Sequence, residues 1–353
     1  MYYSKIYTAG SGLTNQIFSL IKSIIIAYKN NNKVIIVDNF LNDFSKNKYT
    51  PISQILNIDK MNIFLKKKYD IIIIDKNNIS FELYSIKYGI NEAIIDLTDY
   101  VKKHHYKNDC LFISKNTILN NIKGDPCNGI KKHLFFNYKI NNYNIEEIYD
   151  ENLQNDICTD FMNAYYVNTF GWIDSLNKDM FENILINIEY NSDFINKSQF
   201  IIDNNIDTTD NINVLHLRLE DDAIHHWSKM NNMNADTFKL YIEDKYIALI
   251  KKYIKHTDKN IILSQSLSNR VINFLITNNY KYIFTPKFFD DREKNAIVDL
   301  LLSKKCTNIF IGNFNLVNLN GSTFSYYITK LLNPDVTTIT IDLDKIYHDE
   351  CVI

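Results

Sequence analysis

The sequence predicts an α/β protein whose carboxyl-terminal part is a doubly wound parallel sheet. The main observation is that five short apolar runs, typical of buried strands, alternate with four helical patterns over about 130 residues. The chain also opens with a strand, a tight turn and a helix. Of its 353 residues 46% are hydrophobic and 23% are charged, which supports a folded chain long enough for two domains.

The first elements predict a β-α-β unit. Residues 5–9 are short and extended, residues 10–12 interrupt them with two glycines, and residues 13–28 have apolar side chains at helical spacing. Residues 33–37 predict a second strand, which a right-handed crossover would place parallel to the first.

The middle of the chain is harder to interpret. Residues 70–75 and 110–114 are short β-like runs, and residues 177–188 have a helical pattern, but Asn-rich connections separate them. The sequence therefore predicts no order of elements between about residues 39 and 204.

The last part of the chain carries the clear alternation. We expect strands at 214–218, 260–264, 282–285, 308–312 and 337–341. We expect helices at 236–254, 268–277, 293–303 and 322–332. Ligands of such sheets bind beyond the carboxyl ends of the strands.

A polar stretch without periodicity at 203–213 marks a domain boundary. We predict an amino-terminal α/β domain over 1–205. A Rossmann-like α/β domain would follow over 206–353.

Composition excludes several classes of protein. The 39 basic and 41 acidic residues leave a formal charge of -2, so no global basic field favours nucleic acid. The start of the chain lacks the pattern of a secretory signal, and no apolar run approaches the ~20 residues of a membrane span. The five cysteines contain no C-x-x-C pair, which indicates reduced thiols. We expect a soluble cytoplasmic protein.

Codon bias explains part of the composition. Asn, Ile, Lys and Tyr are over-used, as in the AT-rich genome of a large DNA virus or a low-GC microbe. Arginine occurs only at positions 218, 270 and 292. Since lysine replaces the planar, bidentate guanidinium poorly in phosphate contacts, an arginine inside a motif carries extra weight here.

The first strand-to-helix turn spans residues 10–16. Its glycines let the backbone approach a ligand, and the helix amino terminus offers free N–H groups to an anion. An ordinary tight turn has the same pattern. Asn15 stands where a dinucleotide-binding motif has its third glycine, and only Asp38 ends the second strand with an acid, which disfavours a nicotinamide cofactor.

The densest cluster of reactive side chains is at residues 216–222. Strand alternation would place His216 and Arg218 on one face, with Glu220 at the mouth of the site. Arg218 would then pair with a phosphate while a carboxylate or imidazole handles a proton. The alternatives are a structural ion pair of Arg218 or a metal site that uses His216, His225, His226 and an acid.

Two further features stand near the carboxyl terminus. Asp299 borders the apolar stripe of a helix, where a carboxylate needs a donor. Ser322 and Thr323 begin an apolar helix, which predicts an N-cap. The same hydroxyls and free N–H groups would also suit a phosphate.

Together these stretches resemble the GDP-fucose-dependent fucosyltransferase superfamily. Residues 12–16 look like its G-x-x-N-Q loop, and residues 216–222 look like its H-x-R motif in the H-L-R-x-E-x-D form. Residues 296–299, 310–312 and 322–325 are similar to its carboxyl-terminal motif. The form at 216–222 is closest to the protein O-fucosyltransferase and plant O-fucosyltransferase-like branch. The resemblance implies a GT-B fold, with two Rossmann-like domains that face each other across a cleft. Residues 1–205 would then be the acceptor-side domain, and residues 206–353 would bind the nucleotide sugar.

The resemblance also implies roles for single residues. Arg218 would bind the β-phosphate of GDP and stabilise it as a leaving group, while Asn15, in the loop that begins at Gly12, would face the donor sugar. His216 would contact the ribose or phosphates, and Asp299 would accept from guanine or ribose. The phosphate and nucleoside pocket would be lined by Ser322, Thr323 and Phe324.

The catalytic base has several candidates. Glu220, Asp221, Asp222 and His225 all lie near the right strand end, and of these we place Glu220 and Asp222 with Arg218 and Asn15 as catalytic. No metal and no cofactor besides the nucleotide sugar would be needed.

The function implied is an inverting, metal-independent glycosyltransferase. It would move fucose from GDP-fucose to a hydroxyl of a protein or glycan, with no nucleic-acid or membrane partner. The alternatives are transfer of another 6-deoxyhexose of the rhamnose type, a non-catalytic nucleotide-sugar or glycan-binding module, and a plain α/β scaffold.

Overall fold

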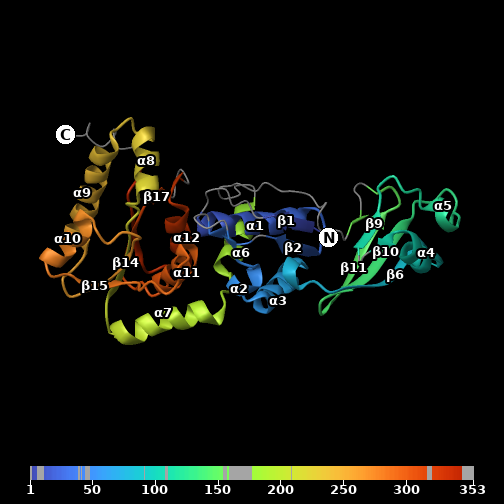
Figure 1. Ribbon diagram of the computed structural model, residues 1–353, viewed down its shortest axis with the longest axis horizontal. Coiled ribbons are helices and arrows are strands. Elements are labelled where there is room, and N and C mark those ends of the chain that lie inside the picture. The colour runs from blue at the N-terminus through green and yellow to red at the C-terminus, as the bar shows by residue number, and fades with distance from the viewer. Residues whose placement is uncertain are drawn as a thin grey trace. The chain divides into compact units, whose positions relative to one another are not determined.

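The computed structural model shows a chain of two compact units (Figure 1). It describes residues 2–5, 12–38, 40, 42–43, 48–90, 92–107, 110–153, 157–158, 177–207, 209–315 and 320–343. The described parts of Met1–Tyr7, Ser19–Asn42 and Lys48–Phe170 form the first unit. The described parts of Thr8–Phe18, Asp43–Asn47 and Gly171–Ile353 form the second.

The first unit contains the predicted β-α-β start. Three parallel strands lie in the order β1-β2-β5, and the helices α1 and α3 connect them in sequence. The predicted helix at 13–28 is confirmed, whereas the first strand ends at Lys5 and residues 6–11 lie outside the described residues. The bounds are β1 Tyr2–Lys5, α1 Leu13–Lys29, β2 Val34–Asp38, α2 Ile52–Ile55, α3 Ile58–Tyr69 and β5 Ile72–Asp75.

A side chain closes the outer edge of this sheet. Among the described strands β5 is at the edge of this sheet, so its outward backbone groups face no neighbouring strand of that set. The buried amide of Asn62 on α3 replaces that neighbour: its Nδ2 donates to the Ile73 carbonyl at 2.9 Å, and its Oδ1 accepts from the Ile73 N–H at 2.7 Å. This pairing satisfies both backbone groups of Ile73.

The rest of the first unit is mainly an antiparallel sheet in the order β11-β10-β6-β7. Alternate residues of β10 are buried, as expected for strands with one face on a core. Asn141, in the left-handed region at φ 52°, forms the tight turn into β11. The bounds are β6 Phe81–Ile90, β7 Ala93–Asp96, α4 Thr98–His104, β8 Tyr106–Lys107, β9 Cys110–Ile113, α5 Asn120–Lys123, β10 His133–Ile140, β11 Tyr143–Asp150 and β12 Ile157–Cys158.

A polar cavity of about 520 Å³ lies at the end of this sheet. The Lys132 side chain beside it is only 3% exposed, and its ammonium lies 3.0 Å from Asp125, 3.4 Å from Glu151 and 2.8 Å from the Ile130 carbonyl oxygen. The buried ammonium of Lys132 is therefore paired with two carboxylates of the cavity lining. None of the predicted site residues lines it.

The second unit is the predicted doubly wound sheet. Five parallel strands lie in the order β15-β14-β13-β16-β19. Helices α8, α9 and α10 pack on one face through Leu215, Ile262 and Ile311, and Figure 1 shows α11 and α12 on the other. The strands are β13 Ile212–His216, β14 Lys259–Leu263, β15 Lys281–Phe284, β16 Ile309–Gly312 and β19 Thr337–Thr340. The helices are α8 Asp221–Met230, α9 Ala235–Tyr253, α10 Arg270–Thr277, α11 Arg292–Ser303 and α12 Thr323–Leu331.

One predicted strand needs a correction. The strand expected at 214–218 is β13, Ile212–His216, so Arg218 lies beyond its end and strand alternation does not place it. Leu217 still donates to the Leu263 carbonyl at 2.9 Å, but the next N–H, that of Arg218, turns to the hydroxyl of Tyr246 at 3.3 Å.

Two helices before the predicted domain boundary belong to the second unit. These are α6 (Lys178–Ile186), which confirms the helical pattern at 177–188, and α7 (Ser192–Asn205). The start of α1 lies in this unit too, where Phe18 packs edge-on against Phe181 at 5.0 Å and Tyr326 at 6.0 Å. The domain limits 1–205 and 206–353 stay a prediction. None of the helices among the described residues combines the length and the apolarity that crossing a bilayer requires.

Candidate functional site

The strand order of the second unit locates its expected ligand site. The chain runs outward from β13 through β14 to β15, then returns to β16 on the other side of β13. Ligands of open α/β sheets bind at such a switch point, beyond the carboxyl ends of the two strands. His216 ends β13, and Gly312 ends β16.

His216 and the start of α12 meet at this point. The His216 Nδ1 atom lies 2.7 Å from the Ser325 hydroxyl oxygen, which also accepts from the Asn313 N–H at 3.0 Å. A methyl group on Gly312 would lie 2.8 Å from the same oxygen, so only glycine leaves room for the serine. Phe324 lies beside the imidazole, with 5.0 Å between ring centroids.

The His216 imidazole is neutral. Burial and, to a lesser degree, the charge of Arg218 lower its pKa to about 3. Since the Ser325 hydroxyl already accepts one proton, we assign its own proton to Nδ1 of His216, which leaves an N–H on Nε2. His216 is then a hydrogen-bond donor without charge.

Arg218 is held by two carboxylates of its own segment. Its Nη1 atom lies 2.6 Å from Glu220 and its Nη2 atom 2.9 Å from Asp222. Burial lowers the pKa of Arg218, but these two charges outweigh it and raise the pKa overall. For Asp222 burial acts in the other direction and raises the pKa, but Arg218 more than offsets this and the pKa is lowered overall. The ion pair expected as the structural alternative therefore exists and fixes the guanidinium. Within the described part of the chain, the other N–H groups of the fork stay available.

Two residues of this network were missed in the sequence. Tyr246 on α9 accepts from the Arg218 N–H, donates to the His216 carbonyl at 2.6 Å and contacts the Asn313 side chain. Asn313 is fully buried, and its Nδ2 atom has no hydrogen-bond partner among the described residues. No sequence signal identifies them, because Tyr246 belongs to an ordinary apolar stripe and Asn313 to an Asn-rich composition.

The start of α12 has the predicted N-cap. The Ser322 hydroxyl accepts from the Ser325 N–H at 3.5 Å. The Thr323 hydroxyl lies 3.0 Å from the Asn15 Oδ1 atom and donates to it. The structure thus joins two predicted site residues 308 positions apart, and a phosphate-binding role for these groups stays a prediction.

The start of α1 meets a carboxylate of the chain itself. The Leu13 N–H donates to Glu293 on α11, and a methyl group on Gly12 would lie 3.6 Å from the same carboxylate. Burial raises the pKa of Glu293, partly opposed by Arg292 and by the Leu13 hydrogen bond. Glu293 is another residue that the sequence did not indicate.

Asp299 lies further along α11. Its Oδ1 atom is buried and has no hydrogen-bond partner among the described residues. Burial raises the pKa of this carboxyl to about 7, and the nearby Thr285 hydroxyl opposes the rise. Thr285 follows β15, two strands from β13, which is about 10 Å at the usual spacing of strands.

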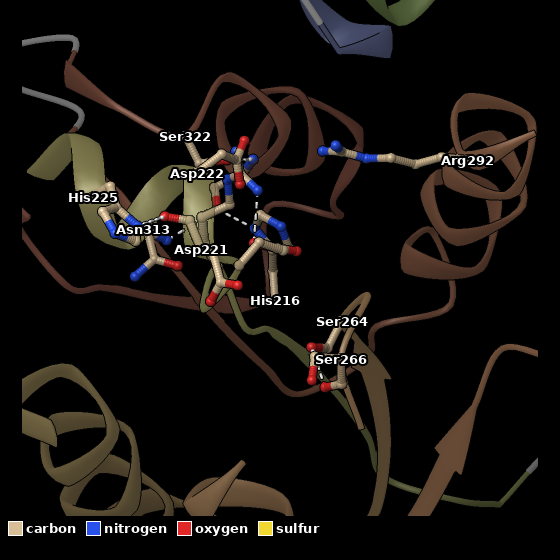
Figure 2. A network of polar contacts seen from close by, with 12 residues as sticks. His216, Asp221, Asp222, His225, Ser264, Ser266, Arg292, Asn313 and Ser322 are labelled. Atoms are coloured by element: carbon tan, nitrogen blue, oxygen red, sulfur yellow. Dashed lines mark hydrogen bonds and ion pairs between the residues drawn. The ribbon is translucent and has the colours of Figure 1, made fainter. Parts of the chain in front are cut away.

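Figure 2 shows the arrangement of the polar side chains at this edge. Asp222, Ser322 and His216 lie together, and Arg292 extends toward them from the start of α11. In the part of the chain that the structure describes, no three His, Cys, Asp or Glu side chains are grouped to hold a metal ion.

The fold is similar to that of two solved glycosyltransferase structures. No protein-family model matches the sequence, and no curated protein does. POFUT1 in complex with GDP superposes with a TM-score of 0.51 at 9% identity, over 96% of this chain and 98% of that chain. POFUT1 in complex with GDP-fucose gives 0.50 at 10% identity, over 96% and 97%. The chain therefore has an α/β, GT-B-like fold.

Proposed function

We propose that this protein is an inverting glycosyltransferase that moves fucose from GDP-fucose to a hydroxyl of a protein or glycan acceptor, without a metal ion. The observation that carries the proposal is the hydrogen bond between Nδ1 of His216 and the hydroxyl of Ser325, at 2.7 Å. It brings the H-x-R motif and the amino terminus of α12 to the switch point of the sheet. The likeness of the fold to POFUT1, a GDP-fucose O-fucosyltransferase, supports the same function.

The chemistry requires positive charge where GDP leaves. Breaking the bond to the anomeric carbon builds negative charge on the diphosphate, and donors fixed in advance stabilise that charge. Arg218 is oriented by Glu220 and Asp222, the amino terminus of α12 adds N–H groups, and the neutral His216 adds one donor. Because their carboxylates bind the guanidinium, we assign Glu220 and Asp222 to holding Arg218 in place.

The nucleoside would bind toward Asp299. Guanine presents adjacent N–H donors, and a carboxylate is the acceptor that matches them. The buried, unpaired Oδ1 atom of Asp299 has this capacity. A nucleoside diphosphate is long enough to extend from the end of β15 to the end of β13. Asn15, bound to Thr323, would then stand at the sugar end of the donor.

The first experiment identifies the donor. We expect GDP and GDP-fucose, but not UDP or dTDP, to raise the unfolding temperature, because ligand at a hundredfold excess over Kd stabilises by ~2.7 kcal/mol. Slow release of fucose from GDP-fucose without acceptor would identify an enzyme, whereas GDP binding without turnover would identify a binding module. A shift with UDP or dTDP alone would contradict the GDP proposal, and no shift with any nucleotide would favour a scaffold.

The second experiment tests the arginine. Arg218→Ala should lower the rate of GDP-fucose turnover by about 10²-fold or more, and Arg218→Lys should also be severely impaired. Arg270→Lys is the matched control, because Arg270 is paired with Asp244 at 2.8 Å. Near-normal turnover of Arg218→Lys would refute the bidentate role.

A further inference from the structure

Arg292 is a second guanidinium at the edge of the proposed donor site. It begins α11, its side chain is 49% exposed, and Figure 2 shows it directed toward His216, Asp222 and Ser322. The sequence assigned it no role in the site. It is nevertheless one of only three arginines in a chain whose composition disfavours arginine.

The three arginines differ in what they bind. Arg218 lies 2.6 and 2.9 Å from two carboxylates, and Arg270 lies 2.8 Å from Asp244. Among the described residues the ion pair of Arg292 is with its neighbour Glu293, at 3.6 Å from Nε. This distance exceeds that of a good hydrogen bond, so the guanidinium of Arg292 is the least committed of the three.

The charges around Arg218 show why a second cation is needed. Glu220 and Asp222 together outweigh the single charge of Arg218, which leaves this group with a net charge of about −1. A sugar nucleotide brings two negative phosphates, whose charge Arg218 alone does not offset. The charge of Arg292 is felt at the same place: burial raises the pKa of Asp222, and Arg218, the Ala223 N–H and, least of these, Arg292 together lower it below its usual value.

We propose that Arg292 binds the diphosphate of the donor as a second guanidinium, opposite Arg218. The inference rests on the proposed function and adds a residue to it. Arg218 is rigid because its partners hold it, whereas Arg292 is half exposed and turns to meet the phosphates as they enter. The Glu293 carboxylate, which lies 3.6 Å from Nε of Arg292, is itself held by the Leu13 N–H.

The test measures binding of GDP and of guanosine to the full chain by calorimetry. Arg292→Gln should weaken GDP binding by about tenfold or more and leave guanosine within twofold, because guanosine has no phosphate. The GDP affinity of Arg292→Lys should lie between those of the wild type and of Arg292→Gln. The matched control is Arg270→Gln, at a side chain that is 47% exposed and also begins a helix, which should change neither affinity.

Each outcome decides the inference. Equal GDP affinity of the wild type and Arg292→Gln would overturn it while the proposed function stands. Equal losses for GDP and guanosine would also overturn it, since the variant would then disturb the fold rather than a phosphate contact. A wild-type protein that binds no GDP would overturn the proposed function and this inference together.

Discussion

Replacing the buried carboxyl of Asp299 by an amide should stabilise the protein while weakening its proposed ligand binding. The pKa of Asp299 is raised from 3.8 to about 7 by burial. A carboxyl whose pKa is raised on folding favours the folded state while it is protonated in both states. That advantage is lost as the pH rises from about 4 to about 7. At pH 8 the loss approaches ~4 kcal/mol, from about three pKa units at ~1.4 kcal/mol each.

We expect Asp299→Asn to recover about half of this, roughly 2 kcal/mol at pH 8, because the amide needs partners of its own. Urea unfolding at pH 5.5 and 8 measures it, and the advantage of the variant should grow with pH. Asp335→Asn, at an exposed position, controls for the lost charge. GDP should bind the variant more weakly. A variant that is less stable than the wild type at pH 8, or a difference independent of pH, would refute the assignment of a buried, ionising carboxyl.

Two further substitutions test the packing of each unit. Gly312→Ala places a methyl group 2.6 Å from the Phe310 ring, which is about 0.8 Å closer than the 3.4 Å at which ordinary contacts begin. We expect the variant to lower the free energy of unfolding, measured in urea, by about 1–3 kcal/mol. Adding Ser325→Ala should restore part of the loss, and a single variant within 0.5 kcal/mol of the wild type would contradict the contact. Lys132→Met leaves two carboxylates without their shared ammonium and should lower the unfolding temperature by several degrees. The neighbouring Lys131→Met removes an exposed pair and should change it little; equal effects would argue against a structural role of Lys132.

The elements that could be predicted from the sequence are those buried on both faces. Strands β13, β14 and β16 are short, continuous apolar runs between helical patterns, and this contrast makes them visible in a single sequence. The sheet of β6, β7, β10 and β11 has one exposed face, and Asn-rich turns obscure its alternation. Its order could not be predicted because antiparallel pairing depends on contacts between distant residues.

The candidate site divides in the same way. His216 and Ser322 stand in local motifs, at the end of a strand and at the start of a helix, so their positions followed from elements next to them in sequence. The contacts of Tyr246 and Glu293 join segments 28 to 280 residues apart, and each residue alone is typical of a helix surface or core. The one sequence signal for Arg292 was the rarity of arginine. That signal could be interpreted only once the structure showed the side chain directed toward the site.

The division of α1 between the two units has a consequence for synthesis of the protein. Its first turns, up to Phe18, pack against α12, whose first residues lie about 308 positions later. At roughly 5–20 residues per second, a ribosome takes about 15 to 60 s to produce that partner. During this interval the apolar side of the nascent helix lacks its final neighbour, so a chaperone that shields it should raise the yield more than one acting after release.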